Sequence, residues 1–121
     1  MTRLTKAEEA IMQMIWRLER CTVSDLLKEI EQAEGQKKPH SSISSIVRIL
    51  EEKGFVDHKA YGRTYEYFPI VTKSAYSKLS LKKLARDYFG GSMNQLVSFL
   101  IQEKQVNVED LSKLIDQMEE E

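Results

Sequence analysis

The stretch that decides the fold is SSISSIVRILEEKGFVDHKAYGRTYEYFP, residues Ser41–Pro69. Its first part repeats apolar residues at helical spacing and ends at Gly54, a residue type that commonly follows the last turn of a helix. Its second part alternates in polarity on either side of Tyr61-Gly62-Arg63, which is typical of a β-hairpin. This order, with a basic residue at the hairpin tip, predicts a winged helix, which places one helix in the major groove of DNA and its hairpin on the flanking backbone.

The helix within this stretch has two different faces. The apolar face, which we expect to pack on two preceding helices, consists of Ile43, Ile46, Val47 and Leu50. Serine is a mediocre helix former, so a run of serines on the other face does not serve helix stability. Short hydroxyl groups let a helix approach DNA closely, and arginine can donate two hydrogen bonds to guanine. We therefore predict that DNA, rather than solvent alone, is contacted by Ser41, Ser42, Ser44, Ser45 and Arg48.

Three further residues are predicted to contact the DNA backbone. His40 stands at the start of the helix, and Lys59 and Arg63 lie near the tip of the hairpin. Either hairpin charge alone would also suit an ordinary edge strand. The net charge of the whole chain is −1, which is not that of a typical DNA-binding protein. The local balance is more favourable, because residues 36–63 carry Lys37, Lys38, Arg48, Lys53, Lys59 and Arg63 against Glu51, Glu52 and Asp57.

Two helices are predicted before this stretch. Thr5 and Thr22 each stand three residues before an acidic residue, Glu8 or Asp25, as in a capping box. The polar segment Gln32–Lys38 contains a glycine and indicates a loop before the third helix. Helical spacing gives the expected core positions as Ile11, Met14, Ile15 and Leu18 in the first helix and Val23, Leu26, Leu27 and Ile30 in the second.

Composition excludes several other classes of protein. The 121 residues are 41% hydrophobic and 31% charged, as in soluble globular proteins, and no apolar stretch is long enough to cross a membrane. We therefore expect a cytoplasmic protein with no membrane insertion.

A single cysteine, Cys21, excludes an internal disulfide, and we expect it to be buried rather than to serve a redox or metal site. No phosphate-binding loop, zinc-ligand spacing or nucleophile elbow is present, so no enzyme activity, cofactor or metal is expected.

Beyond Ile70 the sequence predicts three more helices and no strand. They cover roughly Lys73–Phe89, a segment from Ser92, and a segment that begins at Asn107. Three such helices cannot bury their apolar residues alone, so we expect a second copy of the chain to cover them. The fold class is thus mainly α with a small hairpin, with residues 1–72 as a winged-helix DNA-binding domain and 73–121 as a dimerisation domain. Expected dimer contacts are Leu79, Leu84, Tyr88, Leu96, Val97, Leu100, Leu111, Leu114, Ile115 and Met118.

Over nearly its whole length the sequence resembles the BlaI/MecI family of bacterial repressors. The resemblance implies a homodimer that occupies a palindromic operator in double-stranded DNA and blocks transcription. It also implies that the first two turns of the third helix read the major groove, at Ser41, Ser42, Ser44 and Ser45 here. The residues that carry it are Leu4-Thr5-Lys6-Ala7-Glu8, Met14-Ile15-Trp16, Ile43, Ile46-Val47, Leu50, Lys53-Gly54-Phe55-Val56-Asp57-His58-Lys59, Tyr65-Glu66-Tyr67-Phe68-Pro69 and Gly90-Gly91.

The sequence also departs from the family pattern. Family members often carry Lys, Thr or Arg where this chain has serines, which implies a different operator or more readout through DNA shape and water. Family repression is commonly relieved when a membrane sensor-protease signals cleavage at an Asn–Phe bond in the second dimerisation helix. No such bond exists in Asn94–Leu100, and the nearest candidate lies beside Phe99, within Ser98-Phe99-Leu100. The cysteine cluster of a copper-responsive branch is absent as well, so the inducer stays open.

Two alternatives to a DNA-binding repressor remain at this level. Residues 1–72 carry equal numbers of basic and acidic residues, and this balance, with the serine face, is compatible with a protein-interaction module on a winged-helix scaffold. As an addition to repression, a dimer cleft near Trp16 or Tyr88 could bind a small effector, although no set of polar residues in the sequence points to one.

Overall fold

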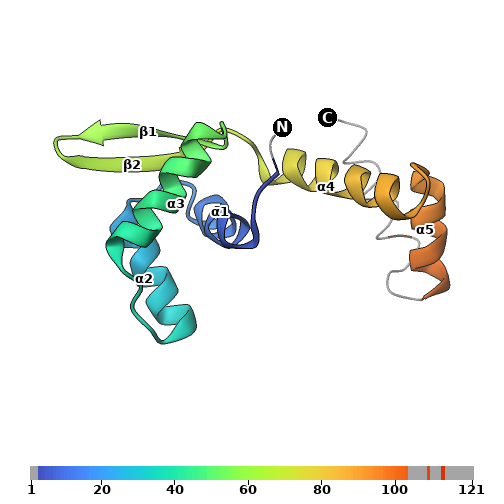
Figure 1. Cartoon of the computed structure of the whole chain (residues 1–121), viewed down its shortest axis with the longest axis horizontal. Coiled ribbons are helices and arrows are strands. Elements are labelled where there is room, and N and C mark those ends of the chain that lie inside the picture. The colour runs from blue at the N-terminus through green and yellow to red at the C-terminus, as the bar shows by residue number, and fades with distance from the viewer. Residues whose placement is uncertain (1–2, 104–108, 110–112, 114–121) are drawn as a thin grey trace. The chain divides into compact units, whose positions relative to one another are not determined.

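The computed structural model describes residues 3–103, Glu109 and Lys113, and it confirms a mainly helical fold with one β-hairpin (Figure 1). Contacts divide the chain into two compact units, Met1–Thr72 and Lys73–Glu121. None of the helices in the described part is long and apolar enough to span a membrane. The elements in chain order are α1 (Lys6–Leu18), α2 (Val23–Glu34), α3 (His40–Glu52), β1 (Val56–Tyr61), β2 (Thr64–Pro69), α4 (Lys73–Tyr88) and α5 (Met93–Gln102).

The two predicted capping boxes set where α1 and α2 begin. The Thr5 hydroxyl accepts from the Glu8 N–H at 3.2 Å, and the Glu8 carboxylate accepts from the Thr5 N–H at 3.1 Å. Thr22 and Asp25 repeat this exchange at 3.1 and 2.9 Å. Backbone N–H groups of the first helical turn, which have no partner within the helix, are satisfied in this way.

The core of the first unit lies where α1, α2, α3 and the hairpin meet. Most of the predicted core positions are buried there, including Ile15, Leu26 and Val47. The prediction for α1 was partly wrong: Met12, which it left out, is fully buried, whereas Met14 and Leu18 are only half-buried. The reason is that α1 contacts α2, α3 and β2, so its buried arc is wider than the single stripe that helical spacing indicates.

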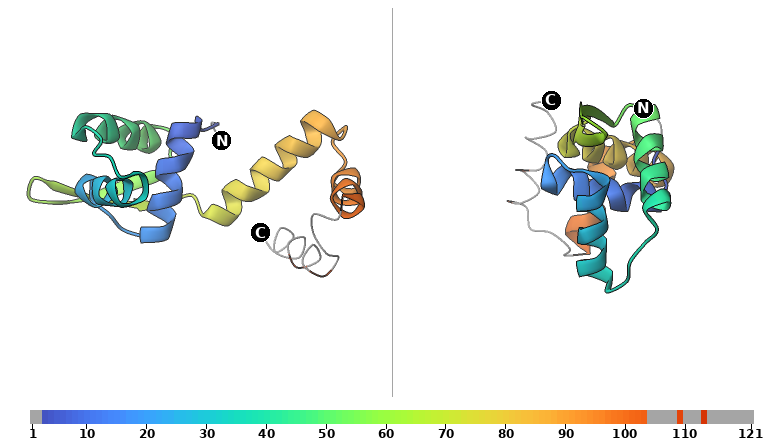
Figure 2. Two further views of the ribbon diagram at one scale, coloured as in Figure 1. Left: turned by 90° about the horizontal axis from the view of Figure 1, so that it is seen from below. Right: turned by 90° about the vertical axis from the view of Figure 1, so that its left-hand side faces the viewer.

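The hairpin has the predicted turn and is anchored to the helices. β1 and β2 are antiparallel, with Tyr61 opposite Thr64 and with Gly62 in the left-handed region at φ 64°. Cys21, in the connection between α1 and α2, pairs with Tyr67 of β2: each backbone N–H donates to the other carbonyl, at 3.0 and 2.7 Å. The base of the hairpin therefore packs against α1 and α3, while its turn projects past the helices (Figure 1 and Figure 2).

A partly buried ion pair lies at the other end of α3. Lys53, which follows the last residue of α3, places its Nζ 2.5 Å from Glu8 Oε1 and 3.1 Å from the Arg3 carbonyl oxygen. Glu8 is the one charged residue among the described residues that is buried. The hydrogen bond from Lys53 is the main cause that holds the pKa of Glu8 below its ordinary value of 4.5, against burial, which would raise it.

In the second unit, α4 and α5 are joined at Gly90-Gly91, where both residues have positive φ. Ser92, from which a helical segment was predicted, caps α5 by accepting from the Gln95 N–H at 3.1 Å. Ala85 and Leu96 are the buried residues of these two helices. The third helix expected from the sequence lies outside the described residues, together with Leu111, Leu114, Ile115 and Met118.

Replacing Lys53 tests the ion pair with Glu8. Lys53→Met should lower the free energy of unfolding by about 1–3 kcal/mol at pH 7, because a buried carboxylate loses its partner. The pKa of Glu8 is lower in the folded protein than in the unfolded chain. The stabilisation that the ion pair gives is therefore fully present above about pH 4.5, and it is lost as the pH falls through the pKa that Glu8 has in the folded protein. Urea unfolding at pH 7 and pH 3 should therefore show a smaller difference between variant and wild type at pH 3.

The matched control is Arg17→Met, which breaks the exposed ion pair between Arg17 and Glu29 in the same unit. Exposed pairs contribute about 0–1 kcal/mol, so this variant should stay close to wild type at both pH values. Equal losses in the two variants would contradict the structural role of Lys53.

Candidate nucleic-acid interface

One side of α3 is available to a large ligand. The apolar face of the helix is directed into the core, through Ile43, Val47 and Leu50. The predicted DNA-contacting residues lie on the remaining surface: Ser44 is half-buried, and the exposed ones are His40, Ser41, Ser42, Ser45 and Arg48. Arg48 Nη2 donates to Ser45 Oγ at 3.3 Å, which orients the guanidinium along the exposed surface of the helix.

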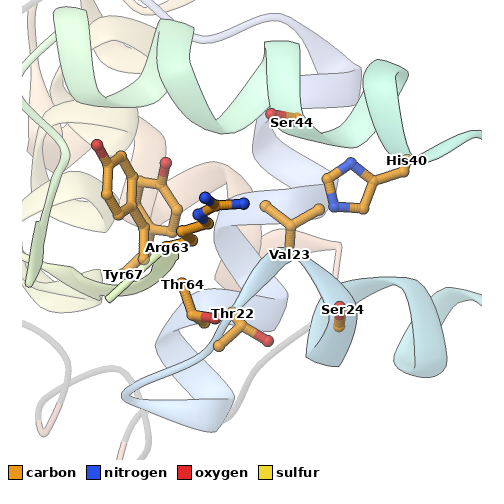
Figure 3. A pocket seen from close by; sticks show the side chains of 9 residues that line it. Thr22, Val23, Ser24, His40, Ser44, Arg63, Thr64 and Tyr67 are labelled. Atoms are coloured by element: carbon orange, nitrogen blue, oxygen red, sulfur yellow. The ribbon is translucent and has the colours of Figure 1, made fainter. Parts of the chain in front are cut away.

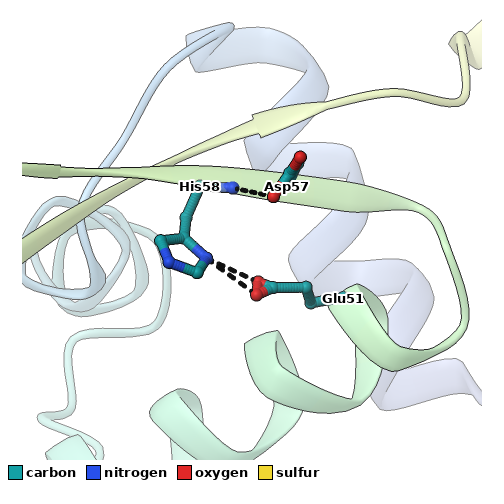
Figure 4. Close-up of side chains that lie close together, drawn as sticks. All are labelled: Glu51, Asp57 and His58. Carbon is teal, nitrogen blue, oxygen red and sulfur yellow. Dashed lines mark hydrogen bonds and ion pairs between the residues drawn. The ribbon is translucent and has the colours of Figure 1, made fainter.

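The β1–β2 hairpin, which is the wing of this fold, is connected to α3 by side chains as well as by the core. His58 Nδ1 of β1 lies 2.7 Å from both carboxylate oxygens of Glu51, in the last turn of α3 (Figure 4). The His58 ring also stacks on Tyr65 of β2, with the ring centroids 4.2 Å apart. The backbone N–H of His58 donates to Asp57 Oδ1 at 2.8 Å, so both its backbone and its ring are engaged within this unit.

Among the described residues, Glu51, Asp57 and His58 form one group that could hold a metal ion, with ligand atoms within 4.8 Å of one another. Glu51 and His58 bond each other directly, as Figure 4 shows, so the pair is satisfied without an ion. Its structural effect is to fix the wing against the end of α3.

A concavity of about 240 Å³ lies between the start of α2, α3 and the hairpin (Figure 3). It brings together three of the predicted DNA contacts, His40, Ser44 and Arg63. The Arg63 guanidinium and the His40 ring are both directed into it. The other predicted contacts do not line it: Ser41, Ser42, Ser45 and Arg48 lie elsewhere on α3, and Lys59 extends over the ring of Tyr61, with its Nζ 5.5 Å from the ring centroid.

Sequence reasoning did not find the remaining polar residues of this concavity, which are Thr22, Ser24, Thr64, Tyr65 and Tyr67. Thr22 was recognised as a helix cap, but nothing local indicated that the start of α2 meets the hairpin. The Cys21–Tyr67 backbone pair creates this meeting, and it joins positions 46 residues apart (67 − 21). Tyr67 is buried, which raises the pKa of its hydroxyl with a further contribution from nearby Glu51 and Tyr65, so the group stays a neutral donor.

Cys21 is buried, as predicted. Burial is the main cause that raises the pKa of its thiol to about 12, and the carboxylates of Asp25 and Glu66 add to it. Because the thiolate is the reactive and metal-binding form of cysteine, a thiol that stays protonated at neutral pH does not suit redox or metal chemistry.

The second unit has an apolar surface of a different kind. A groove of about 380 Å³ is lined by Leu84, Tyr88, Phe89, Leu96, Phe99 and Leu100. Of the expected dimer contacts, Leu79, Leu84 and Tyr88 are exposed, Val97 and Leu100 are half-buried, and Leu96 is buried among its own neighbours. Tyr88 is 76% exposed, the largest value among the exposed large hydrophobic residues of the described part.

A helix with an open polar face beside a two-stranded hairpin defines the first unit as a winged helix. Two solved structures share this fold. The solution structure of the DNA-binding domain of the repressor BlaI has a TM-score of 0.52 and 24% identity, and the match covers 61% of this chain and 88% of that one. A complex of the protein hsRosR-S4 has a TM-score of 0.57 and 17% identity, covering 84% and 90%.

Sequence comparison gives the family. The profile of the penicillinase repressor family matches residues 4–120. The penicillinase repressor of Bacillus licheniformis is 22% identical over 118 residues, which are 98% of this chain and 91% of the relative. The methicillin resistance regulatory protein MecI of Staphylococcus aureus strain N315 is 21% identical over 111 residues, 92% and 89% of the two chains. The chain belongs to the penicillinase repressor family, and it is therefore a DNA-binding transcriptional repressor of this type rather than an enzyme.

Proposed function

We propose that two copies of the chain together occupy a palindromic operator, with each α3 in the major groove and each wing on the adjacent backbone, and so block transcription in the cytoplasm. The observation that carries this proposal is the arrangement of α3. One face is fixed in the core, while the serines and Arg48 stay open beside a wing that carries Lys59 and Arg63. Residues 1–72 would act as the DNA-binding domain and residues 73–121 as the dimerisation domain.

The charges of this surface suit DNA better than the net charge of −1 indicates. Arg48, Lys59 and Arg63 form no ion pair with any described acidic residue. Two carboxylates of the same unit are engaged elsewhere: Glu8 by Lys53, and Glu51 by His58. Arg48, Lys59 and Arg63 are thus free to neutralise DNA phosphates. Such neutralisation supplies most of the sequence-independent affinity of a protein for DNA.

Sequence readout is assigned to α3. Arg48 would donate to a guanine, and Ser41, Ser42, Ser44 and Ser45 would bond phosphates or base edges at close approach. Serine hydroxyls both donate and accept, so they discriminate between bases less strongly than arginine or asparagine. An operator read in this way should depend more on DNA shape and bridging water at the serine positions.

Dimer formation is assigned to the apolar groove of α4 and α5. Exposed Leu84, Tyr88 and Phe99 gather around it, and a surface of this kind is covered most simply by a second copy of the chain. Two copies related by a two-fold axis would present two recognition helices to two half-sites.

The proposed release of the operator is loss of the dimer, by a signal that the sequence does not identify. Proteolysis beside Phe99, triggered by a membrane sensor-protease, is one route. Ser98 and Phe99 are exposed and Leu100 is half-buried, but all three lie within α5, so cleavage requires the helix to open locally. A cut there would separate Leu96 from Leu100, two lining residues of the same groove.

The direct test of sequence-specific binding is selection of bound duplexes from a random pool with the purified protein. We expect an enriched two-fold-symmetric site, and an affinity that falls steeply with salt, by about 0.9 in log K per log unit of salt for each phosphate neutralised. No enrichment, with weak binding or none, would instead favour a protein-interaction module on the winged-helix scaffold.

Replacing Arg48 tests the assignment of base readout. Arg48→Ala should weaken binding to the selected operator by about 1–3 kcal/mol and relax the preference at one base pair in each half-site. Fluorescence anisotropy on the operator and on single-base variants measures both effects. Arg86→Ala, which removes an exposed arginine of α4, is the control and should change neither. Unchanged affinity and base preference in Arg48→Ala would remove this residue from the readout.

Replacing Tyr88 tests the dimer surface. A charge in the centre of an apolar contact is strongly unfavourable, so Tyr88→Asp should raise the dimer dissociation constant at least about tenfold. Sedimentation velocity over a range of protein concentrations measures the change. Tyr61→Asp, at an exposed tyrosine of the wing, is the matched control and should leave the dimer intact. A wild-type protein that sediments as a monomer at micromolar concentration would contradict the proposal.

A further inference from the structure

We propose that the concavity between α2, α3 and the wing is a phosphate-binding site. A small free anion that carries a phosphate group can occupy this site, and it thereby competes with the DNA backbone. The competition rests on the proposed function; binding of the free anion does not. The shared chemistry is a phosphate group, which either the backbone of bound DNA or a dissolved small molecule can supply.

The first support is the charge of the lining. Arg63 enters from the turn of the wing and His40 from the first turn of α3, and both are directed into the concavity (Figure 3). Neither side chain makes a hydrogen bond or an ion pair with another described residue. No carboxylate is among the lining residues. A lining with two unpaired nitrogen-bearing side chains and no carboxylate favours an anionic ligand over a cation or a neutral molecule.

The second support is the ring of hydroxyl groups around these donors. Thr22 and Ser24 lie at the start of α2, Ser44 on α3, and Thr64 at the start of β2. Hydroxyl groups can donate to phosphate oxygens from several directions, because their hydrogen rotates to suit the acceptor. Arginine adds two parallel donors whose spacing matches two oxygens of one phosphate.

The third support is size. The concavity of about 240 Å³ is several times the roughly 30 Å³ share of one water molecule. It is nevertheless smaller than the roughly 300–1,000 Å³ of pockets that enclose drug-sized ligands. A phosphate group with a small substituent is therefore the class of ligand that it suits, rather than a large apolar inducer.

The location gives the site its regulatory consequence. His40, Ser44 and Arg63 belong both to this lining and to the surface assigned to DNA. A bound anion would satisfy the donors that the DNA backbone needs and would repel the phosphates next to it. Occupancy by a free phosphate-bearing molecule should therefore lower operator affinity without any change in the fold.

The test is a titration of the full chain with inorganic phosphate, and then with pyrophosphate, in the absence of DNA. Backbone amide NMR shifts are followed at constant ionic strength, with chloride as the reference salt. We expect saturable shifts at Ser24, Ser44 and Thr64. Arg63→Gln and His40→Asn should each weaken binding about tenfold, the factor for one lost charge-assisted hydrogen bond.

Lys59→Gln is the matched control, because Lys59 is an exposed wing cation that does not line the concavity. It should weaken DNA binding as Arg63→Gln does, but leave phosphate binding unchanged. In a second experiment, phosphate at constant ionic strength should lower the operator affinity of wild type and have little effect on Arg63→Gln.

Shifts that do not saturate, or that are the same in wild type and Arg63→Gln, would show that the concavity is not a phosphate-binding site. Saturable binding of phosphate with no effect on operator affinity would overturn the competition. If the protein binds no DNA at all, the proposed function fails, while the titration without DNA still decides whether the phosphate-binding site exists.

Discussion

The reciprocal backbone hydrogen bonds between Cys21 and Tyr67 are the contact on which the rest of the first unit depends. They join the connection between α1 and α2 to the second strand of the wing, in a place where both residues are buried. Hydrogen bonds shielded from water are costly to leave unmade, so this pair strongly opposes detachment of the hairpin. On the other side, the Glu51–His58 contact fixes β1 against the end of α3. Without these two attachments, a two-stranded hairpin would be only marginally stable.

This anchoring has a direct consequence for recognition. A helix and a wing that are held together present their donors to DNA in one fixed arrangement, so little conformational freedom is lost on binding. The anchoring also creates the concavity at which the start of α2, α3 and the wing turn meet. The charges near this surface are arranged in a compatible way: Glu8 is paired with Lys53 and Glu51 with His58, whereas Arg48, Lys59 and Arg63 make no ion pair with a described acidic residue.

Local signals predicted most of this fold. The capping boxes at Thr5 and Thr22, the glycine after α3 and the turn at Gly62 each have a short-range physical cause, and each was found from the sequence. The position of Met12 was missed because several neighbours pack around α1, which periodicity alone does not reveal. The concavity was missed for a related reason: it depends on Cys21–Tyr67, a contact between distant positions with no sequence signature. The DNA-contacting residues and the dimer surface stay predictions, and part of that surface lies outside the described residues.

The central claim is that α3 and the wing act on DNA as one surface. The most direct measurement maps backbone amide shifts of the full chain when the selected operator is added, compared with a scrambled duplex of equal length. We predict operator-specific changes that cluster at His40–Arg48 in α3 and at Lys59–Arg63 in the wing. Changes confined to α4 and α5, or equal for both duplexes, would contradict it.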